Sequence, residues 1–284
     1  MADQRTILIT GATGRQGGAV LRALSGSGFE LRALTRTPDS DAAKALAAGG
    51  VQVIKGDFDD PASLKPALAG AWGTLSIQNT WEAGVKKEEE QGKRLAQLAR
   101  EAGVQHFVYH SVASAHRRTG IPHFDNKARI EDTVRQLQFP SHVIIRPVFF
   151  MENLLTPGFL RDDKLSAALK PTTRLQMIAV RDIGQYGARA FTDAERLNRR
   201  EIDIAGDEVT MPDAAAALSA GLGRPVEFVE IPLAEIRKVS EDYGTMLEWF
   251  ERVGYNANIP ALVREFGIQP TTIATWMKAH AAAR

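Results

Sequence analysis

The sequence contains no cysteine. A chain without thiols has no disulfide bonds, no thiolate zinc site, no iron–sulfur cluster and no cysteine nucleophile. Any redox chemistry of this protein must therefore run through a bound cofactor.

Long apolar runs and an excess of one charge are also missing. No stretch reaches the roughly 18 apolar residues of a membrane-spanning helix, and the apolar run in MADQRTILIT is too short for a signal-peptide core. Lys and Arg number 35 against 34 for Asp and Glu, and basic residues never follow one another in long runs. We therefore expect a cytoplasmic protein with no membrane partner and no nucleic-acid partner.

The 284 residues are 44% hydrophobic and 24% charged, which is typical of an ordinary soluble globular protein. The length fits either one large domain or a main domain with a smaller one, and we expect the second. In the first half, β-branched runs alternate with helical stretches. Strands are predicted at 6–10, 31–35, 51–56, 74–78, 106–110 and 142–146, and helices at 15–27, 40–49, 61–69, 84–103 and 122–138.

Alternation of this kind predicts an α/β fold, a Rossmann-type doubly wound parallel sheet covered on both faces. After Arg146 the pattern changes. Strands are predicted at 174–180 and 201–205, helices at 181–192 and 212–222, and the remainder is helical and rich in large side chains. We predict a dinucleotide-binding domain over 1–153 and a smaller, mainly helical domain over 154–284, with the alternative that 174–206 returns to the first sheet.

The stretch GATGRQGG directly follows the first predicted strand and opens the first predicted helix. Gly11, Gly14 and Gly17 allow a tight turn, close approach of a pyrophosphate and close packing of helix on strand. The amides and dipole of the helix start would bind the diphosphate. A glycine-rich turn without a ligand is the alternative.

The second predicted strand ends in Thr35 and Arg36, where an NAD-binding protein would have an acidic residue for the ribose hydroxyls. Arg36, together with Arg15 from the glycine loop, can instead bind a 2′-phosphate by charge-assisted hydrogen bonds. The sequence therefore favours NADP(H) over NAD. The alternative is a pair of solvated surface arginines.

His123 and Lys127 lie one turn apart in the helix predicted at 122–138. They share a stripe of roughly 80° with apolar positions, namely Ile130, Val134 and Leu137. Lys127 should therefore face the sheet, where a lysine needs a partner, and we expect the ribose hydroxyls of the dinucleotide. A lysine that extends from the helix start to solvent is the alternative.

Five motifs together resemble the NmrA-like family of atypical short-chain dehydrogenases. They are GATGRQGGAV, GDFDD, IQNTWE, HFDNKARIE and RPVFFMENLL, within residues 5 to about 155. The stretch AGDEVTMPDAAAALSAGLGRPVEFV is similar to the C-terminal half of the family. The resemblance implies a Rossmann fold that binds NADP(H), in a reductase of quinones or other small molecules or in a redox sensor that regulates a protein.

The resemblance also implies roles for residues at the ends of the strands. Asp57 and Phe58 would meet the adenine, Gln78 to Thr80 would line the crevice beside the adenosine and pyrophosphate, and Phe150 to Asn153 would frame the nicotinamide. The cofactor-binding residues that we expect are Gly11, Thr13, Gly14, Arg15, Gln16, Gly17, Arg36, Asp57, Phe58, Gln78, Asn79, Thr80, Lys127, Phe150 and Asn153.

For catalysis the resemblance points to Lys127, His123 and Ser111. Related reductases have a proton-donating tyrosine four residues before the lysine, and this chain has His123 instead. The charge of Lys127 and the positive helix start favour a neutral imidazole, so we expect His123 to donate one N–H bond to a carbonyl. Ser111, at the end of the fifth strand, would orient the substrate oxygen, or merely cap a turn.

The combined expectation is an NADPH-dependent reductase of a small hydrophobic hydride acceptor, quinone-like or carbonyl-like. Its pocket would lie between the nicotinamide and the helices that carry Tyr243, Trp249 and Phe250, although such aromatics are more often core. The alternative is a non-catalytic NADPH sensor with a regulated protein partner. The oligomeric state stays open, with a homodimer as one candidate.

Overall fold

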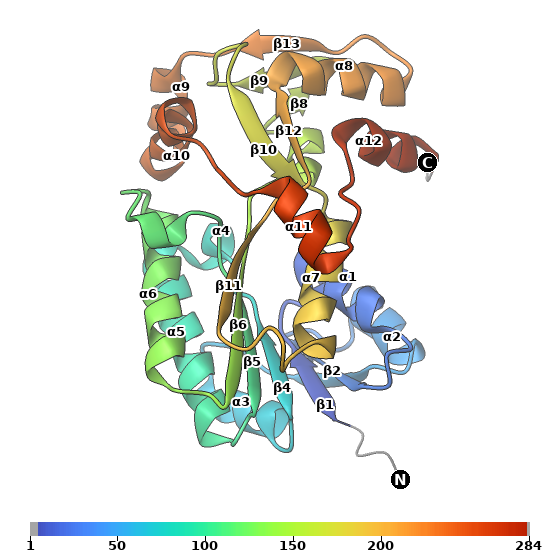
Figure 1. The fold of residues 1–284 in the computed structure, drawn as a ribbon, viewed down its shortest axis with the longest axis vertical. Helices are drawn as coiled ribbons and strands as arrows, with labels where there is room; N and C mark the ends of the chain where they lie inside the picture. The colour runs from blue at the N-terminus through green and yellow to red at the C-terminus, as the bar shows by residue number, and fades with distance from the viewer. Residues whose placement is uncertain (1–4, 283–284) are drawn as a thin grey trace.

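The computed structural model describes residues 5–282. Its large sheet has seven parallel strands in the order β11-β6-β5-β4-β1-β2-β3 (Figure 1). These strands are β1 (Thr6–Ile9), β2 (Glu30–Thr35), β3 (Gln52–Lys55), β4 (Gly73–Ser76), β5 (His106–His110), β6 (Ser141–Pro147) and β11 (Arg200–Ile204). The predicted doubly wound sheet is confirmed. Because the strand order reverses between β1 and β4, a crevice opens at their carboxyl ends.

Helices cover both faces of this sheet, as Figure 1 shows. One face carries α1 (Arg15–Leu24), α2 (Asp41–Ala48) and α7 (Val180–Thr192), and the other carries α3 (Pro61–Leu68), α5 (Val85–Glu101) and α6 (Pro122–Gln136). The alternation along β1 follows from its pleat. Ile7 and Ile9 pack into the core with α1 and α7, whereas Leu8 packs into the core with α3, α5 and α6.

The remaining chain forms a second part, at the top of Figure 1. It holds two three-stranded sheets, β12-β10-β7 and β13-β9-β8. Their strands are β7 (Phe149–Phe150), β8 (Leu160–Arg161), β9 (Lys164–Ala167), β10 (Arg174–Ile178), β12 (Asp207–Thr210) and β13 (Glu227–Glu230). Its helices are α8 (Met211–Leu222), α9 (Leu233–Val239), α10 (Glu241–Arg252) and α12 (Ile273–Ala282). Helix α11 (Ile259–Phe266) lies beside α7, and Leu262 and Phe266 pack into the core with α1 and α7 (Figure 1). The expected smaller, mainly helical region is present, but most of its short strands were not predicted.

The segment 174–206 divides between the two parts. β10 pairs with β7 and β12 in a small sheet, whereas β11 pairs with β6 at the edge of the large sheet. α7, between them, packs against α1. Within this segment, β11 therefore belongs to the large sheet and β10 to a small one. The predicted division into domains, with its boundary at residue 153, stays a prediction. Within residues 5–282 no helix is both long and apolar enough to span a membrane.

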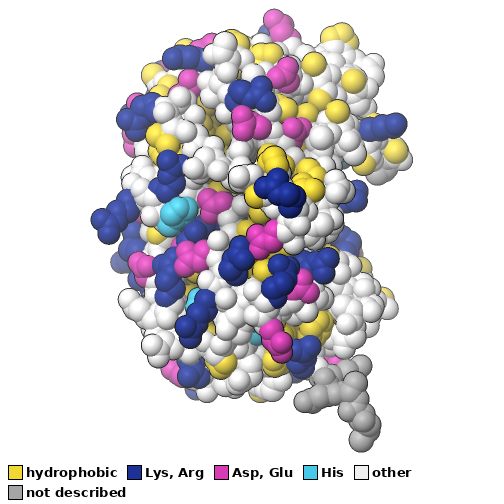
Figure 2. All heavy atoms as spheres, viewed as in Figure 1, with side chains coloured by type: hydrophobic (Ala, Val, Ile, Leu, Met, Phe, Trp, Pro, Cys, Tyr) yellow, Lys and Arg dark blue, Asp and Glu magenta, His cyan; other side chains and the backbone are white. Residues whose placement is uncertain are grey.

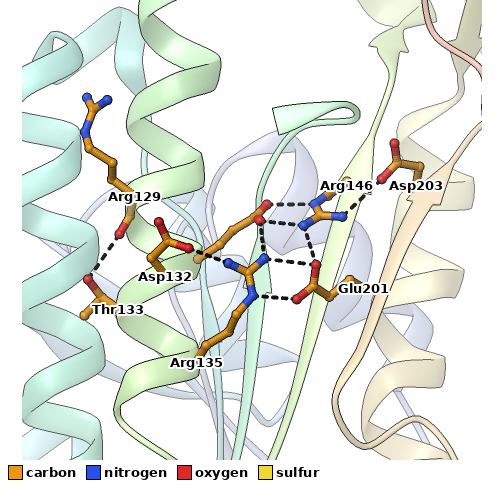
Figure 3. Close-up of polar contacts among 8 residues, drawn as sticks. Arg129, Asp132, Thr133, Arg135, Arg146, Glu201 and Asp203 are labelled. Atoms are coloured by element: carbon orange, nitrogen blue, oxygen red, sulfur yellow. Dashed lines mark hydrogen bonds and ion pairs between the residues drawn. The ribbon is translucent and has the colours of Figure 1, made fainter. Parts of the chain in front are cut away.

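An ion-pair network fixes α6 against the sheet (Figure 3). Arg146 of β6 is 4% exposed and donates two hydrogen bonds to Glu131 of α6 and one to Glu201 of β11. Arg135 of α6 also binds both carboxylates, and Asp203 pairs with Arg146 on its other side. Because buried charges are tolerated only when they are paired, this network constrains where α6 can lie. The first two turns of α6 carry the predicted histidine and lysine.

Candidate functional site

A cavity of about 1030 Å³ lies at the carboxyl edge of the large sheet, between the sheet and the second part. The glycine loop and the ends of β2 to β6 line one side, and Phe159, Tyr243, Met246 and Tyr255 line the other. All the predicted site residues lie on its wall: Gly11, Thr13, Gly14, Arg15, Gln16, Gly17, Arg36, Asp57, Phe58, Gln78, Asn79, Thr80, Ser111, His123, Lys127, Phe150 and Asn153. The structure thus brings them together, and their individual roles stay predictions.

The glycine loop has the geometry that a diphosphate needs. Gly11 adopts a left-handed φ of 61°, and its carbonyl accepts the Gly14 N–H at 2.9 Å. A Cβ on Gly17 would lie 2.4 Å from the Gly11 oxygen, so the close contact of α1 with the loop requires glycine there. Gly14, the N-cap of α1, supplies no side-chain cap. The first amides of α1 are therefore available to an anion in the cavity.

The two arginines expected at a 2′-phosphate have separate partners. Arg36 pairs with Glu82 in the short helix α4 (Thr80–Ala83), and both side chains are about half exposed. Arg15 donates to the Asn153 side chain at 3.3 Å. The predicted joint binding of one phosphate by both arginines is therefore not preformed. It stays a prediction, and it would require Arg36 to leave Glu82.

At the adenine end, the Asp57 carboxylate accepts the N–H of Asp59 at 2.9 Å, and its own N–H donates to Ser63. Phe58 is partly buried against the core under α3 and α5. Both residues thus have fixed orientations at the cavity wall. Gln78 is likewise held, by a 3.0 Å bond to Ser76, and Asn79 caps α4 through the N–H of Trp81.

Lys127 has a partner within the protein. Its ammonium pairs with Glu88 of α5, whose side chain is fully buried. Thr80 and Asn126 donate to the same carboxylate. Burial alone would raise the pKa of Glu88, but the Lys127 charge and these hydrogen bonds outweigh it and lower the pKa. The inward orientation of Lys127 is confirmed. The inference that it needs the ribose as a partner is not, because Glu88 already fills that role.

His123 is bound from the second part of the molecule. Its Nδ1 lies 2.7 Å from Oδ1 of Asp242, at the start of α10, and its side chain is 7% exposed. The backbone N–H of His123 points at the same oxygen, at 3.4 Å. Trp81 and Phe124 pack against the imidazole, with ring centroids 5.1 and 4.9 Å away. No charge partner for His123 was expected from the sequence.

Asp242 changes the prediction for His123. A carboxylate only accepts hydrogen bonds, so Nδ1 carries a proton, and a neutral imidazole has no second N–H for a substrate carbonyl. The charge of Lys127, which was expected to oppose an imidazolium, is balanced by Glu88. A neutral His123 in this geometry therefore has no N–H left for the bond to a substrate carbonyl that we expected from the sequence.

Ser111 and His110 are buried polar groups at the end of β5. The Ser111 side chain is 5% exposed and its Oγ has no hydrogen-bond partner within residues 5–282. An unpaired buried hydroxyl on a cavity wall is well placed to bind a ligand oxygen. His110 contacts the Gln16 side-chain oxygen through Nδ1 at 3.0 Å, and burial lowers the pKa of His110 to about 3. Neutral His110 thereby fixes a residue of the glycine loop.

Sequence reasoning missed Glu88, Asp242, Trp81 and His110. Glu88 was concealed in the run KKEEE, which resembles a solvated face, yet it lies on the stripe of α5 that continues through Gln91, Gly92, Leu95, Ala96 and Ala99. That spacing is a signal that could have found it. Asp242 carries no comparable local signal. Of the expected pocket aromatics, Tyr243 lines the cavity, whereas Trp249 and Phe250 are 4% and 3% exposed core residues.

Charged groups elsewhere are dispersed. Figure 2 shows basic and acidic side chains intermixed over the face that it draws. Within residues 5–282, no group of three or more His, Cys, Asp or Glu side chains is arranged to hold a metal ion. The cavity is therefore the candidate functional site of this protein.

Residues 3–277 match the model of the NmrA-like family, and the chain belongs to this family. Two fungal NmrA-like oxidoreductases are 35% identical to it over 160 and 164 residues, and these matches span only 48% and 49% of their length. The NAD(P)H azoreductase of Xenophilus azovorans is 28% identical over 98% of both chains.

Solved structures show the same fold. The NADPH-dependent quinone oxidoreductase QOR2 of Escherichia coli, solved with NADPH, superimposes with a TM-score of 0.81 at 23% identity, over 96% of this chain and 99% of that one. NmrA, a negative transcriptional regulator solved with NADP, superimposes with a TM-score of 0.74 at 21% identity, over 99% of this chain and 91% of the regulator. One fold thus carries both kinds of protein.

Proposed function

We propose that this protein is an NADPH-dependent reductase of a small, hydrophobic, quinone-like or carbonyl-like hydride acceptor. The observation that carries the proposal is the continuity of the cavity, which runs from the uncapped helix start at Gly14 to an aromatic end at Phe149, Phe159 and Tyr243. A site for a nucleotide alone would not need that second end.

The residues present fit a dinucleotide phosphate. The glycine loop would bind the diphosphate, Arg36 the 2′-phosphate, and Lys127 the ribose beside the nicotinamide, with Phe150 and Asn153 framing the ring. The bound dinucleotide supplies the hydride. The aromatic side chains exclude water from the acceptor, and the unpaired Ser111 hydroxyl orients its oxygen.

The relatives favour this proposal over a purely regulatory role. An azoreductase matches nearly the whole chain, and a quinone oxidoreductase shares its fold. The regulator NmrA keeps the alternative of a redox sensor open. For a sensor, NADPH and NADP+ must bind with different affinity or compete with a partner, because a ligand shifts conformations only by differential binding.

A panel assay of NADPH oxidation against quinones, aldehydes, imines and dyes tests the proposal. We expect turnover well above the rate without acceptor for at least one aromatic acceptor. Ser111→Ala should lower kcat by about tenfold or more while NADPH binding, measured by calorimetry, stays unchanged. Ser114→Ala, at a buried hydroxyl that does not line the cavity, is the matched control. Tight NADPH binding without turnover of any acceptor would favour the sensor instead.

A further inference from the structure

The contact between His123 and Asp242 joins the two parts of the molecule at the aromatic end of the cavity. His123 begins α6 beside the large sheet, and Asp242 begins α10 in the second part. The Asp242 side chain is 18% exposed, and its hydrogen bonds within residues 5–282 all come from His123. Asp242 thus stands in the first turn of α10, where a carboxylate is favourable, and also contacts the imidazole.

This contact fixes the ring in one orientation. Nδ1–H points at Asp242, and the rings of Trp81 and Phe124 pack against the imidazole. Nε2 is then the ring nitrogen without a hydrogen-bond partner within residues 5–282. His123 lines the cavity beside Tyr243. When the ring takes up a proton, that proton goes to Nε2, where it becomes a donor to a bound acceptor.

The surroundings balance the charge of a protonated ring. Asp242 faces it from α10, and the ring centroids of Trp81 of α4 and Phe124 of α6 lie 5.1 and 4.9 Å from that of the imidazole. Lys127, one turn further along α6, is itself paired with the buried Glu88. The cation beside His123 is thus already neutralised by a carboxylate, and Asp242 adds a second one.

We infer that Asp242 is a positioning residue that makes His123 the proton donor for acceptors whose reduction consumes a proton. This inference rests on the proposed reductase function. A quinone or carbonyl takes one hydride from NADPH and one proton from Nε2–H of His123. The ring returns to its neutral form with Nδ1–H still bound to Asp242, and solvent restores the proton on Nε2.

This assignment separates two classes of acceptor. A cationic triarylmethyl dye takes a hydride at its central carbon and becomes neutral without any proton, whereas a quinone requires the proton as well. Asp242→Asn, which removes the charge and keeps the shape, should therefore lower kcat for a naphthoquinone by about tenfold or more. Turnover of the dye and the Kd of NADPH should change less than about twofold.

Two variants sharpen this test. Glu241→Gln, the neighbouring acid on α10 that pairs with Arg237 instead, makes the same charge change without touching His123 and should leave both acceptors unaffected. Tyr243→Phe removes the phenol hydroxyl of a tyrosine that lines the same cavity. If Asp242→Asn slows quinone and dye equally, or if Tyr243→Phe and not Asp242→Asn lowers quinone turnover, the inference is overturned.

Nitrogen-15 NMR of labelled protein tests the positioning role of Asp242 without any turnover. In the wild type we expect the ring-nitrogen chemical shifts of a His123 protonated at Nδ1. These shifts should change in Asp242→Asn and stay the same in Glu241→Gln. A neutral ring protonated at Nε2 alone in the wild type would overturn the positioning role. If no acceptor of any class is reduced, the proposed function fails by itself, and the NMR result still tells whether Asp242 positions His123.

Discussion

At the scale of single residues, the Lys127–Glu88 pair decides how a lysine variant must be interpreted. Glu88 is fully buried and keeps its charge because Lys127, Thr80 and Asn126 bind it. A loss of activity on removing Lys127 can therefore reflect a damaged fold as well as a lost ribose contact. The same side chain stabilises the protein and faces the cavity.

Lys127→Met should destabilise the protein by about 3 kcal/mol, because it leaves the Glu88 carboxylate buried and unpaired. The double variant Lys127→Met with Glu88→Gln should recover most of this loss, since the remaining amide is neutral. Urea unfolding followed by circular dichroism measures both. A double variant no more stable than the single one would show that the carboxylate is not the cause.

The second prediction at the scale of residues concerns the ion pair between Arg36 and Glu82. Both are about half exposed and line the cavity, so a 2′-phosphate that binds Arg36 as proposed would displace Glu82. Glu82→Gln should tighten NADPH binding by about two- to fivefold, the range of an exposed ion pair. Arg36→Ala should weaken it by about tenfold or more. NADH binding should hardly change in either case.

The matched control for Glu82 is Glu90→Gln, which removes an equal charge from the neighbouring helix, where Glu90 faces Lys86. It should leave NADPH affinity within about twofold. In an Arg36→Ala background the effect of Glu82→Gln should disappear. An undiminished effect in that background would mean that Glu82 acts on the phosphate through long-range repulsion and not through Arg36.

At the scale of elements, the glycine loop and α1 act as one unit. The missing Cβ of Gly17 lets the first turn of α1 rest against the carbonyls of Thr10 and Gly11. Gly17→Ala should destabilise the protein by about 1–3 kcal/mol through this overlap and move the helix start away from the diphosphate. We expect NADPH binding weaker by about tenfold or more, measured by calorimetry.

Gly49→Ala is the control for this substitution. Gly49 ends α2 with a φ of −81°, and a Cβ there would meet its nearest atom at 3.4 Å. Alanine should therefore be neutral or slightly stabilising, with unchanged NADPH binding. Equal losses in both variants would remove the special role of the Gly17 contact.

Predictability differed between elements for a physical reason. The strands and helices of the first half were predicted to within a few residues, because each has its own apolar period and flanking turn. The short strands β7, β8, β9, β12 and β13 were missed. β8 has two residues, and β13 is stabilised by pairing with β9, which lies some 60 residues earlier in the chain. Pairing at such distance leaves no local periodic signal.

At the scale of the whole molecule, buried histidines link folding to pH. Burial lowers the pKa of His106 to about 4 and that of His110 to about 3. The unfolded chain binds protons at these residues near pH 6.5. Between those values the unfolded state holds more protons, so the free energy of unfolding falls as the pH falls, by up to about 1.4 kcal/mol per pH unit for each histidine.

This stability is fully present above about pH 6.5 and is lost progressively towards pH 4 for His106. His106→Asn should lower stability at pH 7. In this pH window it should also reduce the slope of the unfolding free energy against pH by up to about 1.4 kcal/mol per pH unit, the value for one bound proton. Urea titrations at several pH values measure the slope. A slope identical to that of the wild type would contradict the assigned state of His106.

Acid stability has a second contribution from the network around Arg146. Burial would raise the pKa of Glu201, but hydrogen bonds and charges from Arg135 and Arg146 outweigh it and hold the pKa at about 2. Its depressed folded pKa means that this contribution is present above the unfolded value near 4.3 and is lost as the pH falls towards 2. Glu201→Gln should remove it and leave the histidine slope between pH 5 and 6.5 intact.

The sequence by itself determined the parallel sheet, the glycine loop, the family and the residues that meet at the sheet edge. These depend on periods of two and 3.6 residues and on short motifs, which local chemistry imposes. Only the tertiary structure decided which charged side chains pair with one another around the site. Glu88 pairs with Lys127 across 39 positions, and Asp242 reaches His123 across 119. Such contacts depend on how α5, α6 and α10 pack, because a carboxylate far along the chain has no local pattern that reveals its partner.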